Sequence, residues 1–305
     1  MSSAADPVHT LSDLTDWSFP NTALAVVGQP VAHSLSPAMH NAALRELARA
    51  DGRFADWRFF KFDIAPADLP SALALFHAKG FRGLNLTVPH KMLAVPLLAS
   101  GDLIVQAARA ANTLRRTTEG WEGFNTDGYG LGQALREELG VELKGADVIL
   151  LGAGGAARGA AGEFLRQGCR SLWIGNRTAA HREALLADLR KISMPVAVYG
   201  FDLAQPPADL PRDAVVINAT VLGLKPGDPV PIDLGRLAST VKVFDMIYNP
   251  PKTPLLRQAA RLGLPQANGL SMLVHQGARA LELWTGLRAP TEIMRAAAKT
   301  ALARI

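Results

Sequence analysis

Cysteine is almost absent from this chain of 305 residues, and its one cysteine, Cys169, excludes an internal disulfide. A single thiol is typical of the reducing cytosol, so we expect a cytoplasmic protein. Apolar runs long enough to span a bilayer are missing, which predicts that no membrane segment is present. Residues 1–20 lack the apolar core of a signal peptide, and we expect them to form a flexible extension.

Charge of one sign is not concentrated anywhere in the sequence. The net charge is +5, and no run of basic residues exceeds two. Aromatic residues make up only 6% of the chain, and none is interleaved with basic residues in a nucleic-acid-binding pattern. We therefore expect no nucleic-acid partner and no metal site, and the basic balance reflects either an anionic small-molecule ligand or chance.

Instead, the sequence alternates apolar strands with amphipathic helices. The length suggests two domains, and 49% hydrophobic residues suffice for a core in each. In the first part the pattern predicts strands at 23–27, 57–62 and 83–86, helices at 36–50, 67–79, 89–99 and 103–108, and a hairpin at 111–124. Such alternation is typical of an α/β fold with a parallel sheet.

The second part begins near Thr126 and repeats the alternation. We expect a helix at 127–139, strands at 147–151, 171–174, 196–199, 215–217 and 241–244, and final helices at 269–285 and 291–303. The final helices are expected to return to the first domain. The predicted domains are therefore an α/β domain of residues 21–126 plus 269–305 and a Rossmann-like domain of residues 127–268.

A glycine-rich turn in the second domain predicts a dinucleotide site. Gly152-x-Gly154-x-x-Ala157 follows a buried strand and opens a helix. In that context the first glycine makes a tight turn, the second lets a pyrophosphate approach, and the small third residue allows close packing. The alternative is a glycine-rich turn that binds no ligand.

The next strand indicates which dinucleotide binds. An NAD site usually has an acidic residue about 20 residues further on. Here the strand at 171–174 is followed by Gly175-Asn176-Arg177-Thr178, which contains no acid. The Arg177 guanidinium suits a 2′-phosphate, and such a contact contributes about 1.5–3 kcal/mol. NADP is therefore favoured over NAD, unless Arg177 is simply a solvated loop residue.

The stretch Asn85-Leu-Thr-Val-Pro-His-Lys91 has a lysine where helix electrostatics disfavour one. Pro89 is expected to be the first residue of a helix, which puts Lys91 in the first turn, where the macrodipole disfavours a cation. Leu86 and Val88 have the character of buried residues, and polar Asn85 and Thr87 alternate with them. A lysine tolerated in such a place is often functional. The alternative is a solvated surface lysine.

Three further stretches have the composition of ligand loops. Ser34 and Ser36 precede a helix, where hydroxyls beside exposed N–H groups suit a carboxylate, although Ser36 before Pro37 is equally a plain N-cap. Asn112 and Asp127 bracket the predicted hairpin, and Asp127 is also an ordinary helix-start residue. Met272 and Gln276 are four residues apart and share a helix face, although Met272 could be ordinary core.

Seven motifs together resemble those of the shikimate dehydrogenase family, in the family's order. They are Gly28-Gln-Pro-Val-Ala-His-Ser-Leu-Ser-Pro-Ala-Met-His-Asn41, Asn85-Leu-Thr-Val-Pro-His-Lys91, Asn125-Thr-Asp127-Gly, Gly152-Ala-Gly-Gly-Ala-Ala-Arg158, Asn176-Arg-Thr178, Asn218-Ala-Thr220 and Asp245-Met-Ile-Tyr248-Asn-Pro250. The resemblance implies NADPH-dependent, reversible reduction of 3-dehydroshikimate to shikimate, in aromatic amino acid biosynthesis. We expect a monomer or homodimer, and the sequence does not distinguish the two.

The resemblance also implies residue roles. Lys91 and Asp127 would be the catalytic pair, with Lys91 either protonating the carbonyl oxygen or only stabilising its charge. Substrate ligands would be Ser34 and Ser36 for the carboxylate, Asn85, Thr87, Asn112 and Gln276 for hydroxyls, and Tyr248 nearby. Cofactor residues would be Gly152, Ala153, Gly154, Gly155, Ala156, Ala157, Arg158, Asn176, Arg177, Thr178, Ala219, Thr220, Gly269 and Met272. Of these, Arg158 and 176–178 would surround the adenosine phosphate.

Small departures from the family pattern leave alternatives open. Val221 replaces a usual serine, and His181 with Arg182 stands where one basic residue is common, which weakens strict NADP preference. A quinate/shikimate dehydrogenase using NAD is one alternative. A nucleotide-binding regulator that keeps the fold without turnover is another.

Overall fold

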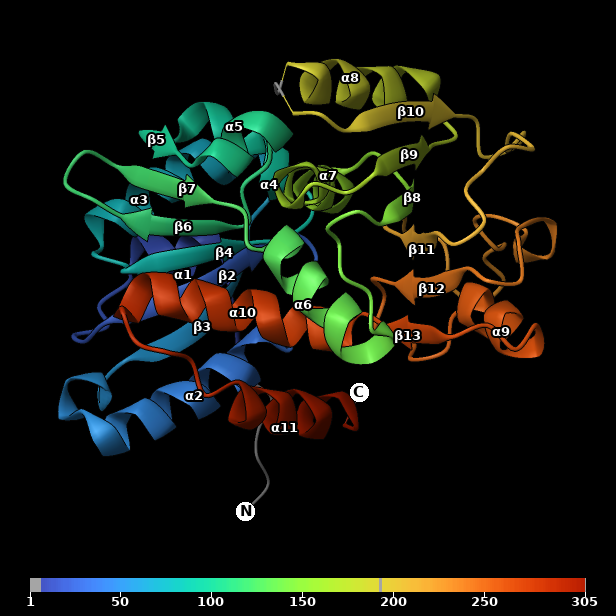
Figure 1. Cartoon of the computed structure of the whole chain (residues 1–305). Helices are drawn as coiled ribbons and strands as arrows, with labels where there is room; N and C mark the ends of the chain where they lie inside the picture. The colour runs from blue at the N-terminus through green and yellow to red at the C-terminus, as the bar shows by residue number, and fades with distance from the viewer. Residues whose placement is uncertain (1–6, 192–193, 305) are drawn as a thin grey trace. The chain divides into compact units, whose positions relative to one another are not determined.

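The computed structural model describes residues 7–191 and 194–304, which form two compact units (Figure 1). Unit 1 contains residues 7–106, 110–126 and 276–304, and unit 2 contains residues 107–109 and 127–275. The chain returns to unit 1 within helix α10 (Leu270–Thr285), between His275 and Gln276 and not at residue 269. The first turn of α10 stays in unit 2 because Met272 packs into the core of that unit.

Unit 1 is built on a seven-stranded sheet of order β1-β3-β2-β4-β6-β7-β5. The strands are β1 (Val8–His9), β2 (Ala23–Gly28), β3 (Arg58–Asp63), β4 (Gly83–Leu86), β5 (Ser100–Gly101), β6 (Thr113–Arg116) and β7 (Trp121–Phe124). Strands β1, β3, β2 and β4 are parallel, and the predicted hairpin β6–β7 adds antiparallel strands beside β4. The sheet is therefore mixed, with its parallel part at the candidate ligand loops.

Helices cover both faces of this sheet (Figure 1). They are α1 (Leu11–Thr15), α2 (Ser36–Ala50), α3 (Leu69–Ala78), α4 (His90–Leu93), α5 (Leu103–Ala108), the later turns of α10, and α11 (Thr291–Leu302). Leu14 of α1 and Phe76 of α3 share a core with Phe62 of β3. On the opposite face, Trp284 of α10 donates from Nε1 to the carbonyl of Leu114 at 2.9 Å.

Residues 7–20 do not form the expected flexible extension. Strand β1 pairs with β3, and the N-cap Thr10 and Asp13 form a capping box at the start of α1. Leu14 is fully buried, and the Trp17 ring lies 4.9 Å from that of Phe60. The segment therefore extends the sheet and its core, and residues 1–6 lie outside the described part of the chain.

The predicted helix at 89–99 is also divided. Pro89 is the N-cap of α4 and not its first residue, and α4 ends at Leu93. A short 3₁₀ turn, Val95–Leu97, follows. Pro96 cannot donate the hydrogen bond that would continue the helix. A helix of four residues has only a small macrodipole, so the electrostatic penalty expected for Lys91 is weaker than a long helix would impose.

Unit 2 is a six-stranded parallel sheet of order β10-β9-β8-β11-β12-β13. The strands are β8 (Asp147–Leu151), β9 (Ser171–Gly175), β10 (Ala197–Phe201), β11 (Val215–Asn218), β12 (Lys242–Asp245) and β13 (Gln266–Asn268). Counting from β8, this is the 3-2-1-4-5-6 order of the Rossmann fold. The order reverses between β8 and β11, which is where such folds bind dinucleotides.

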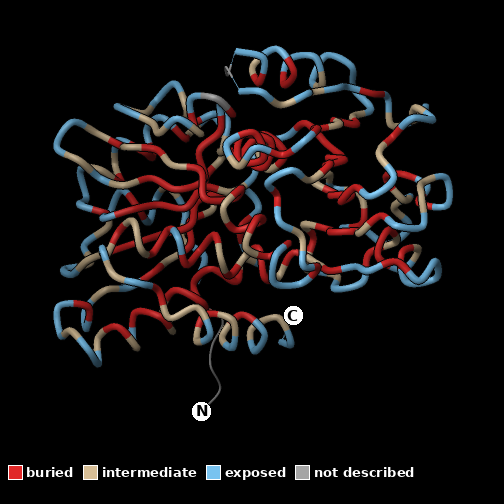
Figure 2. The backbone as a smooth tube through the Cα atoms, viewed as in Figure 1, coloured by how far each residue is buried: buried red, intermediate tan, exposed pale blue. Residues whose placement is uncertain are grey.

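The helices of unit 2 are α6 (Asp127–Leu139), α7 (Gly155–Gln167), α8 (Ala179–Arg190) and α9 (Pro254–Arg261). One core joins α6, α7 and α8 to one face of the sheet, and a second core joins α9 to the other face. Figure 2 shows β8 and β11 buried along their length, as expected for parallel strands covered on both sides.

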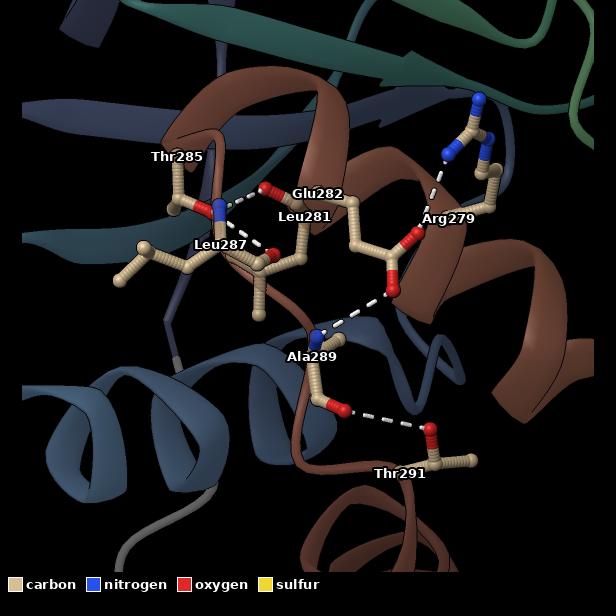
Figure 3. Close-up of polar contacts among 7 residues, drawn as sticks. All are labelled: Arg279, Leu281, Glu282, Thr285, Leu287, Ala289 and Thr291. Atoms are coloured by element: carbon tan, nitrogen blue, oxygen red, sulfur yellow. Dashed lines mark hydrogen bonds and ion pairs between the residues drawn. The ribbon is translucent and has the colours of Figure 1, made fainter.

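The turn between α10 and α11 is fixed by its own polar groups (Figure 3). Thr285 donates from Oγ1 to the carbonyl of Leu281 at 2.8 Å and accepts from the amide of Leu287 at 3.2 Å. Glu282 bonds the amide of Ala289 at 3.3 Å and pairs with Arg279 at 3.2 Å. These contacts fix the path of the chain from α10 into α11.

Within 7–191 and 194–304, no helix is both long enough and apolar enough to cross a membrane. The same described residues contain no group of three or more histidine, cysteine or acidic side chains placed to hold a metal ion.

Candidate functional site

Ser34 and Ser36 follow β2 at the carboxyl end of the parallel strands of unit 1. Ser36 is the first residue of α2, with Pro37 next, and the N-cap is Leu35, so Ser36 is not the N-cap itself. The Ser34 Oγ caps the helix instead and accepts from the Ser36 amide at 3.3 Å. Both serines therefore lie at the N-terminus of a 15-residue helix, an arrangement that suits an anion.

Asn85 and Thr87 occupy the end of β4, the neighbouring strand. The Thr87 amide donates to the carbonyl of Val27 at 3.0 Å, and the Thr87 side chain fills the place a Cβ would take at Gly28. Asn85 is buried, and its Oδ1 has no hydrogen-bond partner among the described residues. This Oδ1 is an acceptor suited to a ligand hydroxyl. Val88 is 63% exposed, contrary to the expectation that it is buried.

Asn112 is the centre of a buried amide network. Its Nδ2 donates to Thr126 Oγ1 at 3.0 Å and to Gln276 Oε1 at 3.2 Å. Its Oδ1 accepts from the Thr126 amide at 2.7 Å and from Thr113 Oγ1 at 3.1 Å. Asn85 joins the network through Nδ2, which donates to Thr113 Oγ1 at 3.1 Å. Unit 1 thus brings together three of the predicted hydroxyl ligands: Asn85, Asn112 and Gln276.

Lys91 lies half-buried in α4, directly after a histidine anchor. His90 is fully buried, with its Nε2 2.9 Å from the carbonyl of Ile64, and burial lowers the pKa of this ring despite that contact. The carbonyl of Lys91 accepts from the Ala111 amide at 2.8 Å. The backbone at Lys91 is therefore fixed on both sides, by His90 and by the segment that leads to Asn112.

In unit 2, the glycine-rich turn has the geometry that a pyrophosphate needs. Gly152 has φ +116°, and a Cβ there would meet the carbonyl of Ala219 at 2.9 Å. No atom lies within 4 Å of the Cβ position at Gly154, so the protein itself does not require glycine there. Gly154 is the N-cap of α7 and provides no side-chain cap, which leaves the first amides of the helix without a bond from the N-cap side chain.

The segment Asn176–Thr178 follows β9. Arg177 and Thr178 are exposed, and Thr178 is the N-cap of α8 without a side-chain cap bond. Asn176 Nδ2 donates to the carbonyl of Thr178 at 2.9 Å, which shapes the turn. Arg182 Nη1 donates to the carbonyl of Asn176 at 3.3 Å. Arg177 therefore lies beside an uncapped helix N-terminus, a suitable place for a phosphate monoester.

Arg158 does not fit the predicted contact with the adenosine phosphate. Its side chain is buried, and Nη1 donates to Asp188 Oδ2 at 2.8 Å and to the carbonyl of Ala108 at 3.4 Å. Burial raises the pKa of Asp188, but Lys191 and Arg158 more than offset this effect, so its pKa lies below the ordinary value. The guanidinium is committed to linking α7 with α8 and with residue 108.

We expect Arg158→Met to lower the free energy of unfolding of unit 2 by about 3 kcal/mol, because it removes one partner of a buried ion pair. The difference from the wild type shrinks as the pH falls through the depressed pKa of Asp188, where the carboxylate protonates. Chemical denaturation at neutral and acidic pH measures both effects.

Arg170→Met is the matched control for Arg158→Met. Arg170 pairs with Asp147, but its side chain is 67% exposed, so we expect a much smaller loss than in Arg158→Met. Equal losses in the two variants would contradict the structural role of Arg158. So would a KM for the dinucleotide that rises in Arg158→Met while stability is unchanged.

Side-chain hydrogen bonds join the carboxyl ends of β11 and β12. Asn218 donates from Nδ2 to Asp245 Oδ1 at 3.0 Å, and its Oδ1 accepts from the Thr220 amide at 3.0 Å. The Ala219 amide donates to the carbonyl of Leu151 at 2.8 Å. These bonds fix 218–220 at the point where the strand order reverses, as expected for a segment beside a dinucleotide.

The remaining predicted residues also lie in unit 2. Asp127 is buried and is the first residue of α6, and Met272 is buried in the core beside α6 and α7. The Gly269 amide donates to the carbonyl of Ile247 at 3.2 Å, which places the start of α10 beside the loop of Tyr248. Burial raises the pKa of Tyr248, so its phenol is a hydrogen-bond donor over a wide pH range.

Three polar residues near the unit 1 site were not predicted from the sequence. Thr113 and Thr126 hold the side chain of Asn112, and they differ from their neighbours only in being hydroxyl residues at the hairpin ends. Lys61 is a lysine inside the apolar strand β3, and its Nζ donates to the carbonyl of Ala32. The sequence feature that could have identified Lys61 is its charge within an otherwise apolar run of β3.

Comparison with known proteins finds three family models along the chain. The model "Shikimate dehydrogenase substrate binding domain" matches residues 26–114, "Shikimate / quinate 5-dehydrogenase" matches 134–221, and "Shikimate 5'-dehydrogenase C-terminal domain" matches 269–299. A protein named shikimate dehydrogenase (NADP(+)) from Geobacter metallireducens is 38% identical over 92% of this chain and 97% of its own length.

Two solved structures are similar over nearly the whole chain. Shikimate 5-dehydrogenase from Thermus thermophilus, in complex with NADP(H) and shikimate, is 35% identical, with a TM-score of 0.79 over 92% of this chain and 99% of that one. Quinate dehydrogenase from Corynebacterium glutamicum, in complex with NAD, is 30% identical, with a TM-score of 0.78 and the same two shares. Backbone similarity alone therefore does not distinguish the two substrates or the two cofactors.

Proposed function

We propose that this chain, which belongs to the shikimate dehydrogenase family, catalyses the reversible NADPH-dependent reduction of 3-dehydroshikimate to shikimate. The observation that carries the proposal is the polar set of unit 1. It combines two hydroxyls at a helix N-terminus, Ser34 and Ser36, with a buried group of amides and hydroxyls at the ends of β4 and β6. That combination matches a small ring with one carboxylate and several hydroxyls.

Each part of the substrate has a partner in this assignment. Ser34 and Ser36 bind the carboxylate, and the buried Oδ1 of Asn85 accepts from a ring hydroxyl. Thr87 and the linked amides of Asn112 and Gln276 bind the other hydroxyls. Both amide protons of Asn112 are already used within the protein. A substrate hydroxyl that accepts from Asn112 therefore replaces the hydrogen bond to Gln276.

The reacting group is a ketone whose oxygen gains negative charge during reduction. Lys91 stabilises that charge and donates the proton, while Asp127 orients the substrate through a hydroxyl. Tyr248 adds a neutral donor at the substrate. NADPH, when bound, supplies the hydride. The rigid backbone on both sides of Lys91 suits a group that must be positioned before the reaction.

Unit 2 fits NADP on three observations. The Cβ position at Gly154 faces open space, the N-terminus of α7 has no side-chain cap, and exposed Arg177 lies at the N-terminus of α8. We assign the pyrophosphate to residues 152–157, the 2′-phosphate to 176–178, and the nicotinamide to Ala219, Thr220, Gly269 and Met272. Arg158 is left out of this set because its guanidinium is committed to Asp188.

A steady-state comparison of shikimate and quinate, each with NADP⁺ and NAD⁺, tests this function. We expect kcat/KM to be highest for shikimate with NADP⁺. Quinate with NAD⁺ as the preferred pair would instead assign the activity named for the Corynebacterium protein. A correctly folded protein that binds NADP⁺ but turns over neither substrate would be a nucleotide-binding regulator.

The proposal includes a cytoplasmic location, supported by the single, buried Cys169. It also includes a monomer or homodimer as the active form, which sedimentation of the active protein distinguishes.

A further inference from the structure

Lys61 is a buried lysine of β3 whose ammonium donates to a backbone carbonyl. Its relative exposure is 6%, and Nζ donates to the carbonyl of Ala32 at 2.9 Å. Among the described residues, no carboxylate lies within ion-pair distance of this ammonium. Asp63, on the same face of β3, bonds Gln29 Nε2 at 3.1 Å. Burying a cation without an anionic partner costs stability, so a chain that keeps one has a use for it.

The acceptor of this ammonium belongs to the segment that presents the two serines. Residues 29–35 connect β2 to α2, and Ala32 is two residues before Ser34. Gln29 is tied to Asp63 of β3 at one end of the segment, and Lys61 holds its middle. The Ser34 amide donates to the carbonyl of Val31 at 3.0 Å, which folds the chain tightly around Ala32. The positive charge therefore lies on the short segment that carries the hydroxyls proposed for the carboxylate.

We propose that Lys61 is a positioning residue for the substrate carboxylate, which holds the 29–35 segment and places a positive charge beside the chain that carries Ser34 and Ser36. The proposal rests on the function assigned above, since it takes the ligand of the two serines to be a carboxylate. A buried charge acts through a medium of low dielectric and is only weakly screened by salt. Lys61 thereby favours an anionic substrate over a neutral one of the same shape.

Two variants separate the charge from the tether. Lys61→Met removes both the charge and the hydrogen bond to Ala32. Lys61→Gln keeps an N–H donor without the charge. We expect the KM for shikimate to rise about tenfold in Lys61→Gln, the effect of one lost charge, and at least as much in Lys61→Met, with kcat and the KM for NADP⁺ unchanged. The neutral methyl ester of shikimate is expected to keep its wild-type KM, a selectivity that a purely structural role would not produce.

Lys242→Met is the matched control. Lys242, in β12 of unit 2, also donates from Nζ to a backbone carbonyl, that of Leu139 at 2.8 Å, but it lies in the other unit from the two serines. We expect its KM for shikimate to equal that of the wild type. Thermal unfolding of every variant checks the fold, and Lys61→Met is expected to melt no lower than the wild type because it removes an unpaired buried charge.

The KM values for shikimate and for its ester decide between these roles of Lys61. Wild-type KM for shikimate in both Lys61 variants would overturn the proposal, and so would equal losses for the acid and its ester. A wild-type KM in Lys61→Gln alone would reduce Lys61 to a tether and overturn the role of its charge. If Lys61→Met does not fold, Lys61→Gln decides. An inactive wild type with shikimate and NADP⁺ would instead contradict the assigned function, a separate and recognisable result.

Discussion

Lys91→Met is expected to lower kcat for shikimate oxidation by about ten-thousandfold, while the KM for shikimate changes little. The size follows from the loss of both charge stabilisation and proton transfer at the reacting oxygen, which each contribute about a hundredfold or more. The small change in KM follows because the carboxylate and hydroxyls of the substrate have other ligands: Ser34, Ser36, Asn85 and Asn112. Steady-state kinetics in both directions measures the effect.

Lys79→Met is the control for this variant. Lys79 follows α3 in the same unit and donates from Nζ to the carbonyl of Trp17 at 3.3 Å on the surface. We expect it to retain wild-type kcat. A near-normal kcat in Lys91→Met would remove Lys91 from the catalytic assignment. A large rise in KM with normal kcat would make Lys91 a binding residue only.

The second large effect is expected at the cofactor. Arg177→Ser should lower kcat/KM for NADP⁺ by about 10- to 150-fold, which corresponds to one charge-assisted contact of about 1.5–3 kcal/mol. The value for NAD⁺, which lacks the 2′-phosphate, should stay within about twofold. The ratio of the two cofactors, measured at saturating shikimate, is therefore the sensitive readout.

Arg190→Ser, an exposed arginine in the last turn of α8, is the control for Arg177→Ser. It should leave the cofactor ratio unchanged. If Arg177→Ser also leaves the ratio unchanged, the 2′-phosphate is held elsewhere, and Arg182, whose guanidinium reaches the carbonyl of Asn176, becomes the candidate.

Local pattern predicted much of the fold. Strands β4 and β8 and helix α6 begin and end at the predicted residues, because an apolar run or an amphipathic period stops at a clear polar or glycine signal. Residues 8–15 were missed because their order depends on distant partners. The Trp17 ring packs against Phe60 and Phe62, more than 40 residues away in the sequence, and no local period records such a contact.

In the site too, features set by local sequence were predicted and contacts between distant residues were not. Motifs located the loops, since glycine, proline and hydroxyl residues at strand ends have local reasons to be there. They did not reveal that Arg158 pairs with Asp188, or that Asn112 is held by Thr126, because each of these bonds joins residues that are well separated in the sequence. The Pro89 and Ser36 predictions were each displaced by one position, since a cap depends on backbone angles that the sequence pattern leaves open.

Identification of the product is the direct test of the assigned reaction. Purified protein is incubated with 3-dehydroshikimate and NADPH, and the products are separated and quantified against standards. We expect shikimate to form, with one NADPH consumed for each molecule, and excess NADP⁺ to drive the reverse reaction. Unchanged 3-dehydroshikimate with unconsumed NADPH, or a reduced product other than shikimate, would contradict that assignment.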